Sequence, residues 1–241
     1  SRIISPFQAE VYPGYDNSVT VMEADWDNLI VLDGCRADLF HDVVDTERFD
    51  ATRTETSLGS STSEWTRRNF ADGRFGDTVY VAGHPFTSKL AGDSFHRIVE
   101  VWRDSFDEEV GTVMPDPTVD ATLDTAEEYP DKRLVAHFMQ PHFPFIDSDV
   151  PNNYWDHTTV LTTRGIDTPW DALAVGDVDA QTLWEAYADN LRYVMDPVFD
   201  LVEELDGKTV ITADHGNMFG EMGWPFPVRF YGHPRNLRYS E

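Results

Sequence analysis

Short runs of apolar, often β-branched residues recur along this chain, and each is followed by a turn. The clearest runs are residues 26–33 (WDNLIVLD), 77–82 (DTVYVA), 134–139 (LVAHFM) and 209–212 (TVIT). Continuous apolar runs of this length, bounded by Gly, Pro or Asp, are typical of strands that are buried on both faces. The pattern therefore predicts at least four buried strands spread over most of the sequence.

Stretches with helical spacing separate these strands. Helices are expected over residues 36–44, 63–70 and 179–205, the last with a bend near Pro197, and residues 95–128 are expected to mix helix with a short apolar piece. Residues 146–180 are rich in Asp, Pro and Trp and predict a long loop or lid. Alternating strands and helices predict an α/β fold, with a mostly parallel sheet covered by helices on both faces. No repeat or linker divides the 241 residues, so we expect a single domain over 1–241.

The charge of the chain changes the expected surroundings but not the fold. The net charge is −26, with 29 Asp against 15 Glu and only 3 Lys against 15 Arg. Such a surface repels nucleic acid and anionic membranes, so neither is an expected partner. Acidity spread over the whole sequence resembles the proteins of salt-accumulating halophiles, in which high salt screens the repulsion. We therefore expect a cytoplasmic protein of such an organism, whose fold loosens at low ionic strength.

The sequence offers no disulfide framework and no visible targeting segment. Cys35 is the single cysteine, which fits a reducing compartment. No apolar run approaches the roughly 20 residues that span a bilayer, and no signal peptide is visible. The chain begins without Met and stops at Glu241 without a clear final element, which would fit a piece trimmed at its C-terminal end from a longer protein.

Three potential metal ligands follow two of the predicted strands. Asp33 ends the first strand, and Asp214 and His215 follow the strand at 209–212. Ligands of open α/β sheets gather where strands end, and carboxylates with an imidazole are suitable metal ligands. The simpler alternatives are that Asp33 and Asp214 cap the helices that follow and that His215 is a loop residue.

A run of hydroxyl side chains precedes the predicted helix at 63–70. Ser61 and Glu64 fit the capping-box pattern, in which Ser61 has a structural role. The same position favours a nucleophile, because the start of a helix attracts a phosphate or sulfate and a metal ion could activate a hydroxyl there. Thr62 and Ser61 are nearly equal candidates, and Thr62 is slightly favoured because Ser61 has the cap to form.

Four further histidines differ in their settings. His142 lies between two prolines after the strand at 134–139, and His233 lies in the stretch Tyr-Gly-His-Pro, so both are held in stiff loops. His137 lies inside a strand and is expected to be a core residue with its hydrogen bonds satisfied. His84 follows the strand at 77–82 and is expected to be a loop or wall residue rather than a ligand.

These pieces together resemble the alkaline phosphatase superfamily, on its sulfatase-like branch. The matching segments span nearly the whole chain in the order of that family: NLIVLDGCRADLF, GSSTSEW, MQPHFPF, ITADHGNMFGE and YGHP. The resemblance implies a three-layer α/β/α sandwich. It implies one divalent metal ion (Mg, Mn or Ca, with Zn also suitable) held by Asp33, Asp214, His215 and the oxygen of the nucleophile. It also implies that His142 and His233 contact the anionic group of the substrate or its leaving oxygen.

The chain departs from sulfatases at the nucleophile. Sulfatases carry Cys or Ser, any residue, Pro, Ser and Arg, whereas this chain has Ser61-Thr62-Ser63-Glu64-Trp65. Formylglycine is therefore not expected, and a plain Ser or Thr nucleophile is. A second metal set cannot be placed, because His137, His142, His233 and Asp189 form no pattern.

The expected function is a metal-dependent hydrolase of phosphate or sulfate esters that uses a Ser or Thr nucleophile. Its substrate would be a small-molecule, glycan-linked or lipid-linked anionic ester. A phosphoglycerol transferase or phosphomutase on the same fold is the first alternative. A non-catalytic sulfatase-like binding protein is the second.

Overall fold

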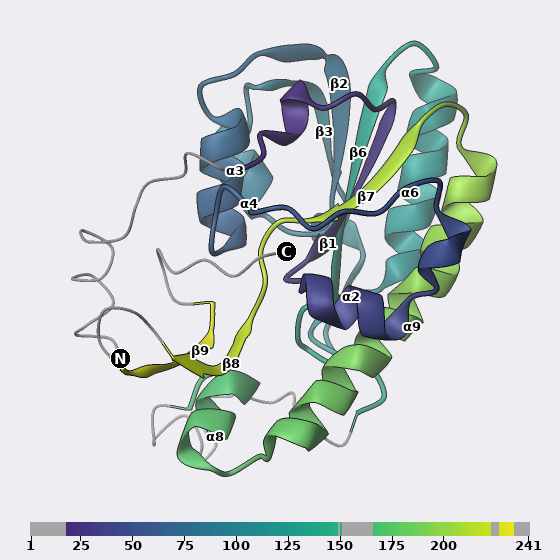
Figure 1. Cartoon of the computed structure of the whole chain (residues 1–241). Helices are drawn as coiled ribbons and strands as arrows, with labels where there is room; N and C mark the ends of the chain where they lie inside the picture. Colours follow the sequence, from purple (N-terminus) through teal and green to yellow (C-terminus); the bar gives the residue numbers. More distant parts are fainter. Residues whose placement is uncertain (1–17, 149, 151–165, 223–226, 234–241) are drawn as a thin grey trace.

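A computed structural model describes residues 18–148, 150, 166–222 and 227–233 of the chain. Its centre is a sheet of five parallel strands in the order β3-β2-β6-β1-β7 (Figure 1). The strands are β1 (Asn28–Asp33), β2 (Phe75–Ala82), β3 (Phe95–Glu100), β6 (Arg133–Pro141) and β7 (Thr209–Ala213). Because all five strands run in the same direction, their carboxyl ends share one edge of the sheet.

Helices cover both faces of this sheet, which makes a three-layer α/β/α sandwich (Figure 1). The central strand β1 shows why: Ile30 and Leu32 pack into one buried cluster, while Leu29 and Val31 pack into another. The first cluster is closed by α2 (Ala37–Val43), α6 (Pro115–Glu128) and α9 (Ala180–Glu204). The second is closed by α3 (Thr62–Phe70), α4 (Phe86–Ala91) and the 3-10 helix η1 (Val21–Glu23). Burial of apolar surface on both faces is the main force that holds the layers together.

Smaller elements surround the carboxyl edge and the periphery of the sheet. They are η2 (Thr46–Arg48), α5 (Val101–Asp104), α8 (Pro169–Val175), the short pair β4 (Phe106–Asp107) and β5 (Thr112–Val113), and the hairpin β8 (Met218–Met222) and β9 (Arg229–Gly232). In Figure 1, β8 and β9 lie beside α8, away from the main sheet. Among the described residues, no helix combines the length and hydrophobicity that crossing a membrane requires.

The four strands predicted from apolar runs are present, each with ends within two residues of the expected bounds. Residues 95–128 were expected to mix helix with a short apolar piece, and the strand β3 at residues 95–100 was not predicted. This strand lies at the edge of the sheet and reads Phe-His-Arg-Ile-Val-Glu, with only Phe95 fully buried. Half-exposed edge strands carry polar residues, so their apolar signal is weak.

The predicted loop at 146–180 contains the helix α8, which begins at a Thr168 cap and ends at Gly176. The rest of that prediction falls largely on residues 149 and 151–165, which lie outside the described residues. α9 runs from Ala180 to Glu204 with Pro197 inside it. The loop after α9 leads into the start of β7, and β7 carries the chain to the edge of the sheet where Asp33 lies, so that Asp214 follows there directly.

Candidate metal and phosphoryl-transfer site

Two aspartates meet at the carboxyl ends of adjacent strands. Asp33 is the last residue of β1, and Asp214 follows β7, its parallel neighbour. Both side chains are almost completely buried. One oxygen of Asp214, Oδ1, accepts the backbone N–H groups of Gly34 and His215, each at 2.8 Å. The other oxygen, Oδ2, and the Oδ1 atom of Asp33 have no hydrogen-bond partner among the described residues.

His215 faces these two unpartnered oxygens with a lone pair. Its Nδ1 lies 3.1 Å from the carbonyl oxygen of Gly216, which can only accept, so Nδ1 carries the proton. Nε2 is then unprotonated and lies 3.4 Å from Asp33 Oδ1 and 3.6 Å from Asp214 Oδ2. Three buried acceptors that face one another need a cation or a proton between them.

The hydroxyl of Thr62 completes this group. Thr62 is the first residue of α3, and its Oγ1 lies 3.2 Å from Asp33 Oδ2 and 3.3 Å from His215 Nε2. Potential ligand atoms of Asp33, Thr62, Asp214 and His215 therefore come together from three separate parts of the chain, with Asp33 facing Thr62 through Oδ2 and His215 through Oδ1. Ligand atoms held about 2.0–2.1 Å from a tetrahedral ion lie about 3.3 Å from one another, so the observed separations fit a divalent ion held by Asp33, Thr62, Asp214 and His215.

Ser61, the other candidate nucleophile, faces the helix rather than the carboxylates. It is the N-cap of α3, and its Oγ lies 3.4 Å from the backbone N–H of Glu64 and 3.3 Å from Ser63 Oγ. The predicted capping box is only half formed, because the Glu64 carboxylate accepts the backbone N–H of Ser60, at 3.2 Å, instead of that of Ser61. The structure thus places Thr62 with the metal-ligand candidates and Ser61 at the cap.

His142 and His233 lie beside His215. The ring centroid of His233 is 4.8 Å from that of His215 and 5.5 Å from that of His142, and His142 is 6.1 Å from His215. Nδ1 of His142 lies 2.7 Å from the carbonyl oxygen of Phe143 and so donates to it, which leaves a lone pair on Nε2. Unlike the buried carboxylates, both rings are partly exposed. They therefore lie where a substrate could reach the site.

The two carboxyl groups differ in acidity. Burial raises the pKa of Asp33, but a hydrogen bond and positive charge from His215 in its protonated form would hold that pKa below its usual range. Burial, followed by repulsion from Asp33, raises the pKa of Asp214 to about 7. Without a cation, the buried pair keeps a proton near Asp214, because two adjacent carboxylates repel each other. A divalent ion would supply positive charge and allow both carboxylates to ionise.

A left-handed turn after β1 positions these groups. Gly34 has a φ of 67°, and a Cβ there would lie 2.8 Å from Asn217 Nδ2 and 3.1 Å from the His142 ring. The amide of Gly34 orients Asp214, and its carbonyl accepts the Tyr187 hydroxyl and the Asn217 side chain. The turn therefore joins β1 and α9 to the chain that follows β7 through hydrogen bonds at a single residue.

The buried side chain of Arg36 stabilises the chain next to the same turn. Its guanidinium forms a two-bond ion pair with Asp38 and donates to Glu221 Oε1 at 2.6 Å and to the carbonyl oxygen of Asn217 at 2.7 Å. The hydrogen bonds to Asp38 and Glu221 raise the pKa of Arg36 although burial opposes this. A buried guanidinium with these partners ties the start of α2 to β8.

Sequence comparisons give no assignment. No family model matches the chain, and no curated protein matches it. Two solved structures with similar folds are forms of lipooligosaccharide phosphoethanolamine transferase A from Neisseria meningitidis. The soluble domain matches over 86% of this chain and 70% of that chain, with 15% identity and a TM-score of 0.52. The integral membrane protein matches over 86% of this chain but only 44% of that one, with 14% identity and a TM-score of 0.56.

The fold is alkaline phosphatase-like. At 14–15% identity the likeness shows the fold alone, and this chain spans less than half of the integral membrane protein. The three-layer architecture that the sequence resemblance implied is therefore confirmed. The roles of Thr62, Ser61, His142 and His233 stay predictions that rest on the geometry above.

Two histidines at the site were not assigned to it from the sequence. His84 and His137 are both buried, and each offers an atom within 4.8 Å of an Asp33 oxygen. The register of β2 against β6 pairs Ala82 with His137, and Gly83 then donates its N–H to the His137 carbonyl oxygen at 2.9 Å. The pairing of β2 with β6 cannot be read from local sequence; the one local signal was that His84 follows a predicted strand, as Asp214 does.

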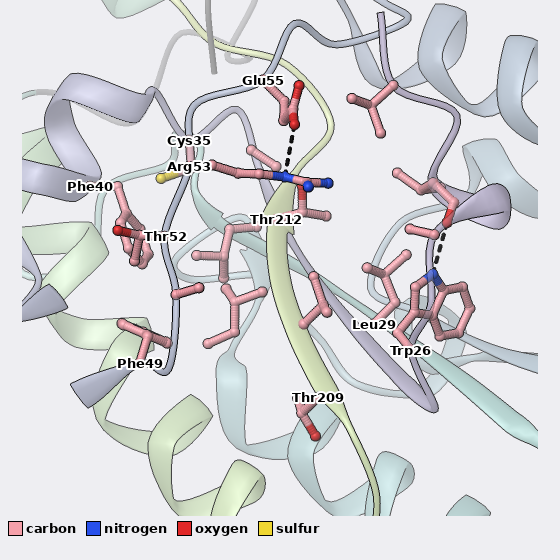
Figure 2. Close-up of a pocket in the computed structure, with 18 of the residues that line it drawn as sticks. Trp26, Leu29, Cys35, Phe40, Phe49, Thr52, Arg53, Glu55, Thr209 and Thr212 are labelled. Atoms are coloured by element: carbon pink, nitrogen blue, oxygen red, sulfur yellow. Dashed lines mark hydrogen bonds and ion pairs between the residues drawn. The ribbon is translucent and has the colours of Figure 1, made fainter. Parts of the chain in front are cut away.

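A cavity lies along β7, apart from these groups. It has a volume of about 890 Å³ and lies between β7 and residues 48–57, with mostly apolar walls. Figure 2 shows Phe49 and Thr52 on one side of β7 and Trp26 and Leu29 on the other. An ion pair between Arg53 and Glu55 crosses the end of this cavity. The described lining includes none of the four metal-ligand candidates.

Proposed function

We propose that this chain is a metal-dependent phosphotransferase in which Thr62 takes a substituted phosphoryl group from a phosphodiester and passes it to an acceptor hydroxyl. One observation carries the proposal: Thr62 Oγ1 lies 3.2 Å from Asp33 Oδ2 and 3.3 Å from His215 Nε2, at the first residue of a helix. The similar fold of two phosphoethanolamine transferase structures supports transfer to an alcohol over hydrolysis by water. The substrate class then corresponds to a phosphoethanolamine-type diester as donor and a saccharide hydroxyl as acceptor.

Thr62 acts as the nucleophile in the first half of the reaction. A bound divalent ion would lower the pKa of its hydroxyl and offset negative charge on the phosphoryl oxygens. The backbone N–H groups of Thr62 and Ser63 are the first two of α3 and precede the hydrogen bonds of the helix, so they can bind those oxygens. Thr62 Oγ1 loses its proton to solvent and forms a bond to phosphorus as the bond to the donor oxygen breaks on the opposite side. That oxygen takes a proton from water and leaves as the alcohol, which gives a phosphodiester on Thr62.

His142 and His233 serve the alcohols that leave and enter. Burial lowers the pKa of His142, so the ring is neutral near pH 7 and its Nε2 lone pair can accept a proton. In the second half, an acceptor hydroxyl attacks phosphorus, His142 takes its proton, and Thr62 Oγ1 leaves. Burial likewise lowers the pKa of His233, to about 3, so His233 is a neutral hydrogen-bond partner for the phosphoryl group.

The separations among the ligand atoms favour zinc among the suitable ions. The four printed contacts among Thr62, Asp33, His215 and Asp214 measure 3.2–3.6 Å, with Asp33 using a different oxygen towards Thr62 and towards His215, and such short separations suit a compact site with one imidazole. Magnesium prefers six oxygen ligands in an octahedron. We expect zinc at about one ion per chain after purification, measured by elemental mass spectrometry.

The test of Thr62 is a pair of neighbouring variants. An aryl phosphodiester in high salt should release aryl alcohol, and intact-mass spectrometry should show the phosphoryl adduct on the protein, mapped by peptide fragmentation to Thr62. Thr62→Ala should lower turnover at least about 1,000-fold, because the reaction loses its nucleophile. Ser61→Ala should keep turnover and cost about 1 kcal/mol of stability, because it loses only a cap.

Acceptor competition separates a transferase from a hydrolase. With rising glycerol, a transferase should form the glycerol diester at the expense of the hydrolysed product. If water remains the only acceptor, the enzyme is a hydrolase. If Ser61→Ala is inactive while Thr62→Ala is active, the nucleophile is Ser61. A chain with no bound divalent metal and no turnover of any ester in high salt would be the non-catalytic binding protein.

A further inference from the structure

His84 and His137 lie next to the metal-ligand candidate Asp33 and have no part in the reaction proposed above. His137 is in the middle of β6 and His84 follows β2, and neither ring is appreciably exposed. Nε2 of His84 lies 3.1 Å from Nδ1 of His137, and the Tyr80 hydroxyl lies 2.6 Å from the same Nδ1. Two buried polar side chains, those of His84 and Tyr80, thus converge on one nitrogen of His137.

The backbone fixes where the proton lies on each ring. The N–H of Phe86 points at Nδ1 of His84 over 3.1 Å, so this nitrogen accepts and a neutral His84 carries its proton on Nε2. That Nε2–H then donates to Nδ1 of His137. Because Nδ1 of His137 accepts, a neutral His137 must carry its proton on Nε2. One backbone amide therefore sets the tautomer of two rings.

The Nε2–H of His137 faces the carboxylate of Asp214. Nε2 has no hydrogen-bond partner among the described residues, and it lies 3.9 Å from Asp214 Oδ2, an oxygen that also lacks one. A buried N–H and a buried carboxylate oxygen, both unpartnered and facing each other, are costly unless a small movement joins them. Closing this gap requires a shift of about 1 Å to reach the usual N···O distance.

We propose that His84 and His137 form an ordered pair that presents an N–H to Asp214 and thereby holds this carboxylate as a metal ligand. The pair consists of positioning residues rather than ligands. The inference rests on the metal site of the proposed function and names what maintains it. Partners behind metal ligands typically change metal affinity 10–100-fold when they are removed.

The alternative is that His84, His137 and Asp33 bind a second metal ion, since their potential ligand atoms lie within 4.8 Å of one another. Coordination through His84 Nε2 would require the proton on Nδ1, where it would face the N–H of Phe86. Two donors would then oppose each other in a buried place, which is unfavourable. The direction of the Phe86 amide therefore favours the ordered pair.

Imidazole nitrogen NMR tests the proton positions directly. Protein labelled with 15N-histidine is compared without metal and with Zn²⁺ alone, in high salt. His137 should show a protonated Nε2 and an unprotonated Nδ1 in both states. A metal-shifted Nε2, or a proton on Nδ1, would overturn the ordered pair and favour the second metal site.

Matched variants test the effect on the metal. Zn²⁺ affinity is measured by chelator competition for His137→Leu, which loses the N–H, and for His137→Gln, whose amide N–H can occupy the place of Nε2. His137→Leu should weaken binding 10–100-fold, and His137→Gln should recover most of the loss. His96→Leu is the control, because His96 is exposed on β3 and contacts only the Tyr129 ring among the aromatic side chains described.

The outcomes separate this inference from the proposed function. Equal affinities for His137→Leu and His96→Leu, or equal losses for the Leu and Gln variants of His137, would overturn the pair, with circular dichroism confirming that each variant is folded. Neither readout involves a substrate, so tight metal binding with no phosphoryl transfer would refute the function and leave the pair intact. A wild-type chain that binds no metal would refute both.

Discussion

The turn at Gly34 gives a sharp prediction, because one added methyl group there should damage both the fold and the metal site. Gly34→Ala places a Cβ on a backbone with φ of 67°, which costs about 1–2 kcal/mol for a left-handed L-residue. The Cβ would also lie 2.8 Å from Asn217 Nδ2 and 3.1 Å from the His142 ring. Forced repacking of this kind costs a further 1–3 kcal/mol, roughly. The expected loss is about 2–5 kcal/mol.

Gly176 provides a matched control. It has a φ of 80° at the end of α8, but a Cβ there would meet nothing within 4 Å. Gly176→Ala therefore carries only the left-handed cost of about 1–2 kcal/mol. Both substitutions restrict the unfolded chain equally, so the difference between the variants isolates the contacts of Gly34.

The assay is urea unfolding at a fixed high salt concentration, together with Zn²⁺ affinity from chelator competition. Gly34→Ala should unfold at a lower urea concentration than Gly176→Ala and bind Zn²⁺ at least about 10-fold more weakly, because its amide orients Asp214. Equal unfolding midpoints and equal affinities for the two variants would show that the turn does not position the site.

Three further predictions concern charge. The melting temperature should rise with salt, since screening weakens the repulsion within a chain of net charge −26, and a salt-independent melting temperature would contradict this. Burial lowers the pKa of His84 to about 4 and that of His233 to about 3, so the unfolded chain binds more protons than the folded chain below about pH 6.5. The metal-free protein should therefore lose stability as pH falls from 6.5 towards 4, although the raised pKa of Asp214 opposes this trend. A urea midpoint that stays constant over that pH range would refute this prediction. Arg36→Met should lower the free energy of unfolding by about 2–3 kcal/mol. This is less than the loss expected on breaking a fully buried ion pair, because the acidic partners of Arg36 are partly exposed. A decrease below about 0.5 kcal/mol in urea unfolding would show that the Arg36 ion pairs are not needed for stability.

The strands at the centre of the sheet could be predicted because burial on both faces demands continuous apolar runs. β1 and β7 read Asn-Leu-Ile-Val-Leu-Asp and Thr-Val-Ile-Thr-Ala; β1 ends in Asp33, and β7 is followed by Asp214 and His215. Asp33, Asp214 and His215 were predicted to converge on that basis, and the structure places them together. β3 and the β8–β9 hairpin escaped prediction because exposed strands need no such run.

Local sequence could not decide between two adjacent hydroxyls. Ser61 and Thr62 differ by one position, and only the direction in which α3 leaves the edge of the sheet places Thr62 Oγ1 against Asp33. The same holds for His137, which was expected to be a core residue with its hydrogen bonds satisfied. It is a buried residue, but its Nε2 has no partner among the described residues, and this became visible only once β7 brought Asp214 near.

The strand order has a consequence for how the chain is made. β1 is synthesised early, yet its two neighbours in the sheet are β6 and β7, and the hydrogen bond between Gly34 and Asp214 spans 180 residues. At roughly 5–20 residues per second on the ribosome, about 10–40 seconds pass between the appearance of the two residues. Until β6 (Arg133–Pro141) has been made, β1 has neither of its neighbours, and until β7 has been made it has only one. During this time the acidic remainder of the chain must keep this buried strand in solution.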